Sequence, residues 1–253
     1  MSSERRLFAE HAWDIPSGVE LLQTTRYGGV SQAPYDSFNL ALHVGDDSSA
    51  VLKNRDLLRQ YLPSEPLWLN QVHGEHVLDA DQEVHGTPDA DAAVTTQAER
   101  VLVIMTADCL PVYFVDRQAR VIGLAHAGWR GLAKGVLTKT WALMCEKVPD
   151  LKASDVDVFL GPAIGPQAFE VGQEVKDIFL LWGANRAQAF SDGVAGKTCA
   201  NLYLLAAMEL SQLGIGHIHA YHWCTYSQDQ FYSFRRSKVT GRMASLLWIK
   251  KHT

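Results

Sequence analysis

The chain has 253 residues, 47% of them hydrophobic, which is enough to bury a substantial core in one large domain or two small ones. Its 28 acidic and 23 basic side chains give a net charge of −5, which excludes the basic surface that binding to nucleic acid or an anionic membrane requires. The four cysteines are widely scattered, so no disulfide framework is expected. These features favour a protein that acts on a small molecule.

Targeting and domain organisation give the next expectations. The first residues contain no long apolar run typical of a signal peptide, and no segment reaches the ~18 uncharged apolar residues of a membrane span. We therefore predict a cytoplasmic protein. No repeat, low-complexity tract or Pro/Ser-rich linker interrupts the sequence, so a single domain is expected over residues 1–253. Nothing in the sequence indicates an oligomeric state.

The first half of the chain predicts one helix among several short strands. A strand is expected at 19–26 and is followed by a glycine turn at 27–37. Apolar residues recur with a helical period at 48–62, after serines that can cap a helix. Three further short strands are predicted, at 67–74, 76–80 and 90–95.

The second half predicts strands and helices in an irregular order. We expect strands at 101–106, 112–116 and 120–126, a helix from Trp129 to Lys147, a strand at 155–161, helices at 172–182 and 201–214, and strands at 218–223 and 231–236. No GxGxxG or Walker A motif follows a strand, and no regular βαβ alternation is visible. This pattern favours an α+β sandwich over a nucleotide-binding fold.

Three residues with metal-binding or acid/base chemistry lie at the polar ends of apolar strands, beside glycines. They are His73 in "LNQVHGEHV", Cys109 in "MTADCLPV" and His126 in "IGLAHAGWRG". Cys109 and His126 are 17 positions apart, which leaves room for two strands and two turns, so both can reach one end of a sheet. Two imidazoles and a thiolate are ligands that zinc favours, and three ligands leave the fourth position open.

Two other interpretations of these residues stay open. Cys109 can instead be a nucleophile, with His126 or His73 as its base and Asp108 or another carboxylate as the orienting group. Neighbouring residues of a strand face opposite sides, which disfavours Asp108 in that role. In the simplest interpretation Cys109 fills the core and the histidines are structural, as most such residues are.

Further candidates depend on arginines and a second group of histidines. Arg26 follows a strand beside Gly28–Gly29, and an arginine fork suits phosphate or carboxylate groups. Arg235 and Arg236 are expected to form solvated ion pairs. "HIHAYH" resembles a metal cluster only superficially, and we predict that its histidines lie on the surface or on an edge strand: His217, His219 and His222. The substrate-binding candidates are Arg26, Asn39, Asp108 and Arg130.

Seven motifs in a fixed order give a specific resemblance over about residues 20–245. They are "TTRYGGVSQAPYDSFNLALHVGDD", "LNQVHGEHV", "DADAAVT", "MTADCLPVYFVD", "GLAHAGWRG", "GPAIGPQAFEVG" and "CTYSQDQFYSFRRSKVTGR". Together they resemble the YfiH or laccase-domain family, whose members are also described as polyphenol oxidases, purine nucleoside phosphorylases and peptidoglycan editing factors. One departure is visible, because many relatives carry cysteines where this chain has Pro166, Gln167 and Ala168.

The resemblance implies a fold and a metal centre. The expected fold is a single-domain four-layer α/β/β/α sandwich with mixed sheets, related to cytotoxic necrotizing factor toxins. The implied ligands are His73, Cys109 and His126, which would also be the catalytic residues, and the implied metal is zinc, with copper as an alternative occupant of the same site. This ligand set agrees with the residues selected from the strand ends.

The resemblance also implies several activities. These are phosphorolysis of adenosine, inosine and methylthioadenosine, deamination of adenosine, and weak polyphenol oxidase activity. Multicopper oxidases need many histidines in repeated HxH pairs, and this chain has 10 histidines and a single HxH. We therefore expect a zinc-dependent purine nucleoside enzyme. The alternatives are a cysteine-dependent amidase that edits cell-wall precursors and a non-catalytic binding protein.

Overall fold

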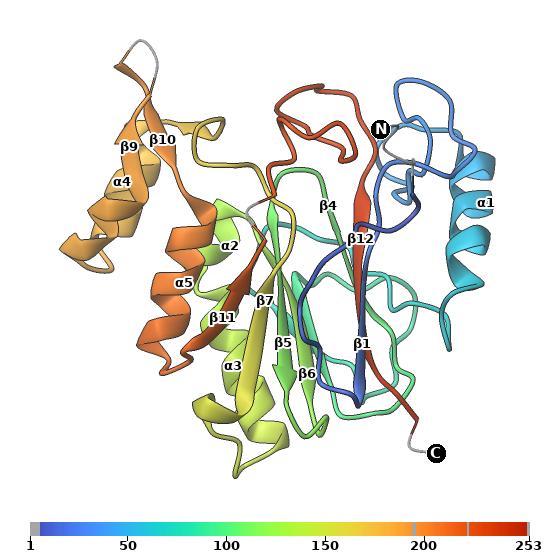
Figure 1. Cartoon of the computed structure of the whole chain (residues 1–253), viewed down its shortest axis with the longest axis horizontal. Helices are drawn as coiled ribbons and strands as arrows, with labels where there is room; N and C mark the ends of the chain where they lie inside the picture. Colours follow the sequence, from blue (N-terminus) through green and yellow to red (C-terminus); the bar gives the residue numbers. More distant parts are fainter. Residues whose placement is uncertain (1–5, 194–195, 222, 252–253) are drawn as a thin grey trace.

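The computed structural model describes residues 6–193, 196–221 and 223–251. Within these residues the strands form three sheets, one with six strands and two with three. Helices cover the outer faces of the two sheets at the centre of the molecule (Figure 1). None of the helices in the described part of the chain combines the length and apolar character that a membrane-spanning helix needs.

The largest sheet is mixed. In spatial order it contains β11 (His217–Ala220), β7 (Val156–Leu160), β5 (Leu110–Asp116), β6 (Ile122–Ala127), β3 (Ala92–Thr95) and β2 (Val77–Asp79). β5 pairs antiparallel with β6 and β7, and β6 pairs antiparallel with β3. The two outer pairs, β11 with β7 and β2 with β3, are parallel. As a result, β5 begins at the end of the sheet where β6 finishes.

A second, antiparallel sheet packs on one face of the first. It contains β1 (Val19–Gln23), β12 (Met243–Ile249) and β4 (Leu102–Thr106), in that order. Alternate residues of β5 separate the two cores: Val112 and Phe114 pack towards helices, whereas Tyr113 and Val115 pack towards the second sheet. Because both faces of β5 are covered, its whole length is buried and apolar.

Helices complete four layers. α2 (Trp129–Lys134), α3 (Val136–Lys147) and α5 (Leu202–Gln212) cover the outer face of the six-stranded sheet. On the opposite side of the molecule, α1 (Ser48–Arg59) packs on the outer face of the second sheet through Leu58 (Figure 1). An extension carries α4 (Gln173–Leu180), the 3-10 turn η2 (Ala184–Ala189) and the third sheet, β8 (Glu170–Val171), β10 (Thr198–Ala200) and β9 (Phe190–Asp192). A second 3-10 turn, η1 (Ala153–Asp155), directly precedes β7.

The mixed α/β architecture is confirmed, and four local predictions are corrected. The helix expected from Trp129 to Lys147 is divided at Gly135, whose φ of 84° ends α2 in the left-handed region that glycine tolerates. The segment 231–236 forms turns rather than a strand, and the final strand is β12, which pattern analysis missed. Segment 67–74 makes only isolated bridges, and of the described residues of "IHAYHW" only Ile218–Ala220 belong to a strand, β11.

The second histidine group lies on an edge of the larger sheet, as predicted for its described members. His217 is exposed at the start of β11, and His219 Nε2 lies 3.4 Å from Asp157 Oδ1 on the neighbouring strand β7. His222 lies outside the described residues. Among the described members, His219 thus contacts a carboxylate on the neighbouring strand, and neither histidine belongs to a metal-binding cluster.

Candidate metal centre

The antiparallel pairing of β5 and β6 brings two of the three expected ligands together. Leu110 pairs with Ala127 and Pro111 pairs with His126, so Cys109, directly before β5, lies beside the end of β6. His73 approaches from the loop before β2, with its Nε2 3.8 Å from Cys109 Sγ. One ligand atom from each of the three residues lies within 4.8 Å of the others. The juxtaposition expected from the strand ends is therefore present.

A single carboxylate, that of Asp91, positions both histidines. Asp91 is fully buried directly before β3, and its Oδ1 accepts a hydrogen bond from His126 Nδ1 at 2.8 Å. The same oxygen accepts from the backbone N–H of His73 at 3.0 Å, while Oδ2 accepts from the N–H groups of Val72 and Gly74 at 3.2 and 2.6 Å. Asp91 thus fixes the His126 ring and the backbone that carries His73 at the same time.

The carboxylate also decides which nitrogen of His126 is available. An ionised carboxylate only accepts hydrogen bonds, so Nδ1 of His126 carries a proton, and Nε2 is the nitrogen that can bind a metal once the ring is neutral. The His126 and His73 rings meet edge to face, with centroids 4.8 Å apart. Both rings therefore direct nitrogens towards the Cys109 sulfur, in an arrangement that suits a shared metal ion.

Charge interactions favour a thiolate in this cluster. Burial alone raises the pKa of Cys109, but the charge of His126 and hydrogen bonds from both histidines outweigh burial and lower that pKa. Burial lowers the pKa of His126, but the Cys109 thiolate and Asp91 raise it by more. Burial likewise raises the pKa of Asp91, while hydrogen bonds from His126 and the loop backbone hold it below its usual range. The metal-free cluster therefore favours a thiolate beside an imidazolium.

The backbone around the cluster is strained and tightly packed. His73 has φ 56° and Asp108 has φ 100°, both unusual for residues with a side chain. A Cβ added to Gly128 would lie 2.9 Å from Cys109 Sγ, so only glycine fits at this position. Strained residues on both sides of one site are typical of functional geometry that the surrounding fold enforces.

Asp108, next to the thiol, is bonded away from the histidines. Its Oδ1 accepts from the Thr225 hydroxyl and its Oδ2 accepts from the Arg235 backbone N–H, both at 2.6 Å. Its carbonyl oxygen accepts from the backbone N–H of Ile164 at 2.9 Å. Asp108 thus ties the turn before Cys109 to two loops from the second half of the chain. The carboxylate that orients the histidine is Asp91.

The cluster opens into a cavity of about 390 Å³, a volume within the range of small-molecule sites. Its walls are aromatic and cationic, with Asp108 as the single carboxylate among the lining residues. Besides the three cluster residues and Asp108, the lining residues include His43, Gln71, Thr106, Trp129, Arg130, Phe169, Phe234, Arg235 and Arg242. This composition suits a ligand that is aromatic and carries negative charge.

The other substrate-binding candidates lie in different places. Arg130 lines the cavity and its guanidinium carbon lies 4.4 Å from the centre of the Trp129 ring. Arg26 does not line the cavity and instead donates to the carbonyl and carboxylate of Asp36. Asn39 is fully buried, and its Oδ1 accepts from the backbone N–H of Arg242. Of the two, only Asn39 therefore contacts a residue of the cavity wall, and direct substrate contacts stay a prediction.

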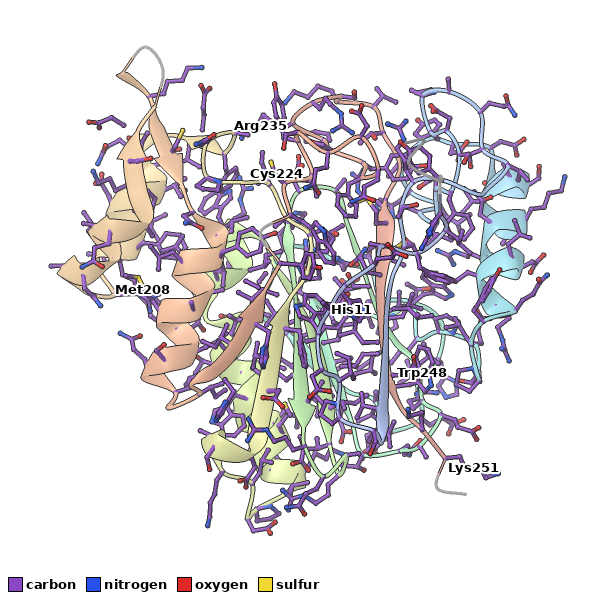
Figure 2. The ribbon with its side chains drawn as sticks, in the orientation of Figure 1. His11, Met208, Cys224, Arg235, Trp248 and Lys251 are labelled. Carbon is purple, nitrogen blue, oxygen red and sulfur yellow. The ribbon has the colours of Figure 1, made fainter. Side chains whose placement is uncertain are left out.

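A larger cavity of about 1190 Å³ lies on the other side of the segment 164–170. Its lining includes Cys224 and Arg235, which Figure 2 labels at the upper end of the molecule. The Arg235 guanidinium donates to the carbonyls of Ala168 and Glu170, and so it belongs to the wall between the two cavities. The larger cavity contains none of the three cluster residues, so we place the chemistry in the smaller one.

Sequence reasoning missed Asp91 as a functional residue. A signal was present, since "DADAAVT" places acidic residues directly before a buried strand. Asp89 and Asp91 both precede the strand in this motif, so the sequence does not show which of them faces His126. The pairing of β3 with β6 places Asp91 there. In the structure, the carboxylate of Asp89 accepts instead from the Asn70 side chain in an exposed position.

Comparison with known proteins connects this site to a family. Residues 20–250 match the family model described as "Multi-copper polyphenol oxidoreductase laccase". The chain is 43% identical over 240 residues to purine nucleoside phosphorylase YfiH of Escherichia coli, covering 94% of this chain and 96% of the relative. It is 45% identical over 240 residues to a purine nucleoside phosphorylase of Pseudomonas aeruginosa, with the same coverage.

Solved structures agree with these relatives. A crystal structure of a Neisseria meningitidis protein superposes with a TM-score of 0.90 at 44% identity, covering 97% of this chain and all of the other. YlmD from Geobacillus stearothermophilus superposes with a TM-score of 0.87 at 29% identity, covering 97% of this chain and 99% of the other. The likeness therefore extends over nearly the full length of each protein.

Proposed function

The chain belongs to the YfiH or laccase-like family, and from this premise we propose that it is a zinc-dependent purine nucleoside phosphorylase. The observation that carries the proposal is the cluster of His73, Cys109 and His126 on the wall of a nucleoside-sized cavity. The names of the full-length relatives support the same reaction. Adenosine, inosine and methylthioadenosine are the expected substrates, with deamination of adenosine as a second reaction.

The donor set fits zinc. It offers two imidazole nitrogens and one sulfur, and zinc favours these ligands over oxygen-only sites. The 3.8 Å between Cys109 Sγ and His73 Nε2 suits two ligands of one tetrahedral ion, since bonds of ~2.1 and ~2.3 Å imply a separation of roughly 3.6 Å. His126 already has the carboxylate partner that metal-bound histidines usually have. His73, Cys109 and His126 would therefore hold the metal.

The residues around the cluster supply binding and orientation. When bound, zinc supplies Lewis-acid polarisation of an oxygen atom close to it. Trp129, Phe169 and Phe234 line the cavity and offer apolar ring faces to a purine base. Asp91 holds a proton on His126 Nδ1, so Nε2 is the nitrogen that would bind the metal. The cavity thus combines a base-binding wall with a polar end.

The proposed reaction is the transfer of a ribosyl group to phosphate. An oxygen of hydrogen phosphate forms a bond to C1′ of the ribose, and the bond from C1′ to the purine nitrogen breaks. The purine leaves with that electron pair and takes up the proton released by the phosphate. The products are ribose 1-phosphate and the free base, and no oxidant or reductant takes part.

Product analysis tests this function. Zinc-loaded protein is incubated with inosine and phosphate, and we expect hypoxanthine and ribose 1-phosphate in equal amounts. A chelator should abolish the release and added zinc should restore it. Lys238→Gln serves as a control, because Lys238 packs over the Phe234 ring outside the cavity wall. If zinc-loaded wild-type protein releases no base from any of the three nucleosides, the proposed function is wrong.

A second candidate function is a cysteine-dependent amidase that acts on cell-wall precursors. The order Asp91, His126, Cys109 supports it, because a carboxylate orients a histidine that lies beside a thiol. In this reaction the thiolate would attack an amide carbonyl, the amine would leave with a proton from His126, and water would hydrolyse the thioester. His73 favours the metal centre, since a Cys–His pair needs no second imidazole against the sulfur.

Chelation separates these two functions. An amidase based on the Cys109 thiolate should keep or gain activity on a muropeptide precursor when metal is removed, whereas the nucleoside reaction should stop. Copper in the same cluster is our proposal for weak polyphenol oxidase activity. In the described residues the cluster is the one group of three or more ligands close enough to share an ion, which argues against a multicopper arrangement.

A further inference from the structure

The cavity beside the metal centre has a positive charge that its own wall does not neutralise. Three arginines line it, Arg130, Arg235 and Arg242, and the single carboxylate is Asp108. Both Asp108 oxygens are occupied by Thr225 and by the backbone of Arg235. No described carboxylate lies within ion-pair distance of any of the three guanidinium groups. The ligand must therefore supply the negative charge.

Arg242 is the arginine held most firmly in the cavity wall. Its Nη1 donates to the carbonyls of Thr240 and Gly241 at 3.0 Å, and its backbone N–H donates to the buried Asn39 side chain. These acceptors are neutral, so they fix the side chain without pairing its charge with a carboxylate. Arg242 lines the same cavity as Cys109 and His126. The position suits an anion bound next to the metal centre.

Thr106 adds an independent observation beside Arg242. The backbone of Thr106 pairs with Met243, so Arg242 lies one position further along the same end of the second sheet. The Thr106 side chain is 2% exposed, lines the cavity, and its hydroxyl has no hydrogen-bond partner among the described residues. A buried hydroxyl without a partner is rare and points to a bound group that completes it.

Two more side chains complete the polar wall. Arg130 is exposed at the start of α2, where it packs over Trp129 and lacks an anionic partner among the described residues. Burial and the positive charges of Arg242 and Arg55 lower the pKa of His43, which keeps its ring neutral and able to donate a hydrogen bond. Arg130 and His43 therefore add hydrogen-bond donors to the polar part of the cavity lining.

We propose that Arg242 and Thr106, with Arg130 at the rim, form a phosphate-binding subsite next to the metal centre. This inference rests on the proposed function and adds to it the residues that hold the attacking phosphate. Arginine forks match the geometry of phosphate oxygens, and charge-assisted hydrogen bonds contribute more than neutral ones. The same chemistry would serve inorganic phosphate or a phosphate carried by the nucleoside.

Binding of inorganic phosphate to metal-free protein tests the subsite without any turnover. By isothermal titration calorimetry, Arg242→Gln should weaken phosphate binding by roughly 10-fold to 100-fold, as expected for loss of a charge-assisted hydrogen bond. Thr106→Val should weaken it several-fold while leaving the melting temperature unchanged or higher, because the hydroxyl it removes has no partner. Lys238→Gln, which removes one nearby charge outside the cavity, should bind phosphate like the wild type.

Thr106→Val keeps the test valid even if Arg242→Gln fails to fold. If neither Thr106→Val nor Arg130→Gln changes phosphate binding in folded protein, the proposed subsite is wrong. In zinc-loaded enzyme, Arg242→Lys should raise the KM for phosphate and leave the KM for inosine nearly unchanged. An equal rise in both constants would contradict a subsite specific for phosphate.

The two sources of phosphate give different binding patterns. If phosphate and inosine bind together, the subsite takes inorganic phosphate, as phosphorolysis requires. If inosine monophosphate binds more tightly than inosine and displaces phosphate, the subsite takes a phosphate carried by the substrate. The inference can stand when the proposed function fails, since phosphate binding lost in Arg242→Gln supports the subsite even where no nucleoside is cleaved.

Discussion

The two ends of the six-stranded sheet carry similar charged residues and use them differently. At the end where β5 begins, here called the open end, a thiol and two histidines converge, and three arginines have no carboxylate partner among the described residues. At the opposite end, where β5 finishes and which we call the closed end, Arg120 forms ion pairs with Asp116 and Asp150. Charge without a carboxylate partner, and not charge itself, therefore distinguishes the end that carries the candidate site.

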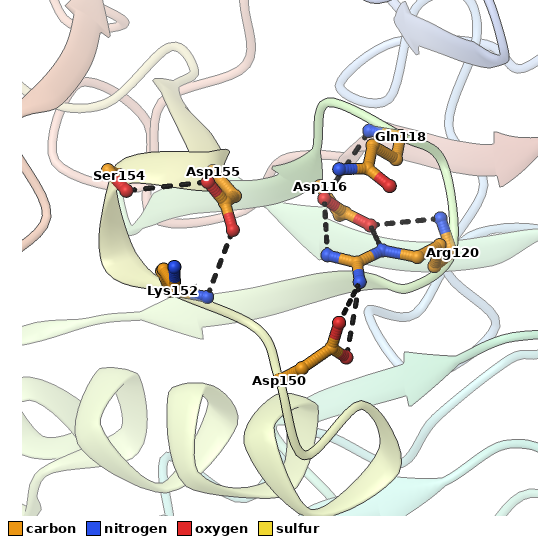
Figure 3. A network of polar contacts seen from close by, with 7 residues as sticks. All are labelled: Asp116, Gln118, Arg120, Asp150, Lys152, Ser154 and Asp155. Atoms are coloured by element: carbon orange, nitrogen blue, oxygen red, sulfur yellow. Dashed lines mark hydrogen bonds and ion pairs between the residues drawn. The ribbon is translucent and has the colours of Figure 1, made fainter.

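The closed end is organised around one buried carboxylate, as Figure 3 shows. Asp116 accepts from Arg120 Nε at 2.7 Å and from the backbone N–H groups of Arg120 and Gln118. Arg120 Nη1 donates in turn to both oxygens of Asp150 at 3.1 and 3.2 Å. Asp116 thus resembles Asp91 in holding a loop through its backbone, but it directs its partner to solvent rather than to a reactive group.

The largest expected effect comes from removing the thiol at the open end. Cys109→Ala should lower nucleoside phosphorolysis by at least about 10³-fold, because it removes a ligand and its charge. Its free energy of unfolding in urea, measured on metal-free protein, should change by less than about 1 kcal/mol, since the thiol is only partly buried. Activity equal to the wild type would show that the open end is not the active site.

The next effect concerns Asp91, which acts through the histidines. Asp91→Asn should weaken zinc affinity by about 10-fold to 100-fold, because it changes the partner of His126 and the anchor of the His73 loop. Competition with a chromogenic chelator measures the affinity. A merely structural role would lower the melting temperature and leave the affinity of the folded protein unchanged.

At the closed end, the expected effect is on stability alone. Asp116→Asn should lower the free energy of unfolding by about 1 to 3 kcal/mol, because it leaves Arg120 with a weaker partner that is still partly open to solvent. The zinc content should match the wild type. Loss of metal in this variant would contradict the separation of the two ends.

The smallest effect is a shift in the pH dependence of Cys109 alkylation. In metal-free protein the lowered pKa of Cys109 keeps the thiolate populated as the pH falls from about 9 towards 6, where an ordinary thiol is protonated and slow. Burial raises the pKa of Cys145, so as the pH falls Cys145 should lose its reactivity at a higher pH than Cys109 does. Mass spectrometry of iodoacetamide-treated peptides measures both. Parallel profiles for the two cysteines would contradict the thiolate assignment.

Metal binding should show the complementary pH dependence. Because the pKa of His126 is raised in the metal-free cluster, zinc must displace its proton, and affinity should fall as the pH drops through that raised pKa. Calorimetry in buffers of different ionisation enthalpy measures the released proton. Zinc binding without proton release would show that the imidazolium is absent.

The three cluster residues could be predicted from the sequence because each is marked by its immediate neighbours in the chain. His73, Cys109 and His126 each lie at the polar end of an apolar strand or beside a glycine, a pattern that survives without tertiary information. Asp91, Thr106 and Arg242 were not found, because their roles depend on which strands pair. The pairing of Met243 with Thr106 links residues 137 positions apart, and no local pattern predicts it.

In the fold, too, the elements with a clear local pattern were predicted, and those that depend on backbone conformation or distant contacts were not. The strands from β4 to β7 were predicted within a few residues because both of their faces are buried and apolar. The break at Gly135 was missed, since the apolar stripe continues through it and only the backbone conformation interrupts the helix. The segment 231–236 has strand-like residues, but its hydrogen bonds go to turns and to the loop after Cys224.

We propose that the open end of the sheet holds a metal ion through a single cysteine and two histidines. Inductively coupled plasma mass spectrometry of gently purified protein tests it most directly. We predict about one zinc per chain in the wild type and in Asp116→Asn, and a loss of at least about tenfold in Cys109→Ala. Wild-type protein without metal, or Cys109→Ala with a full complement of zinc, would contradict the claim.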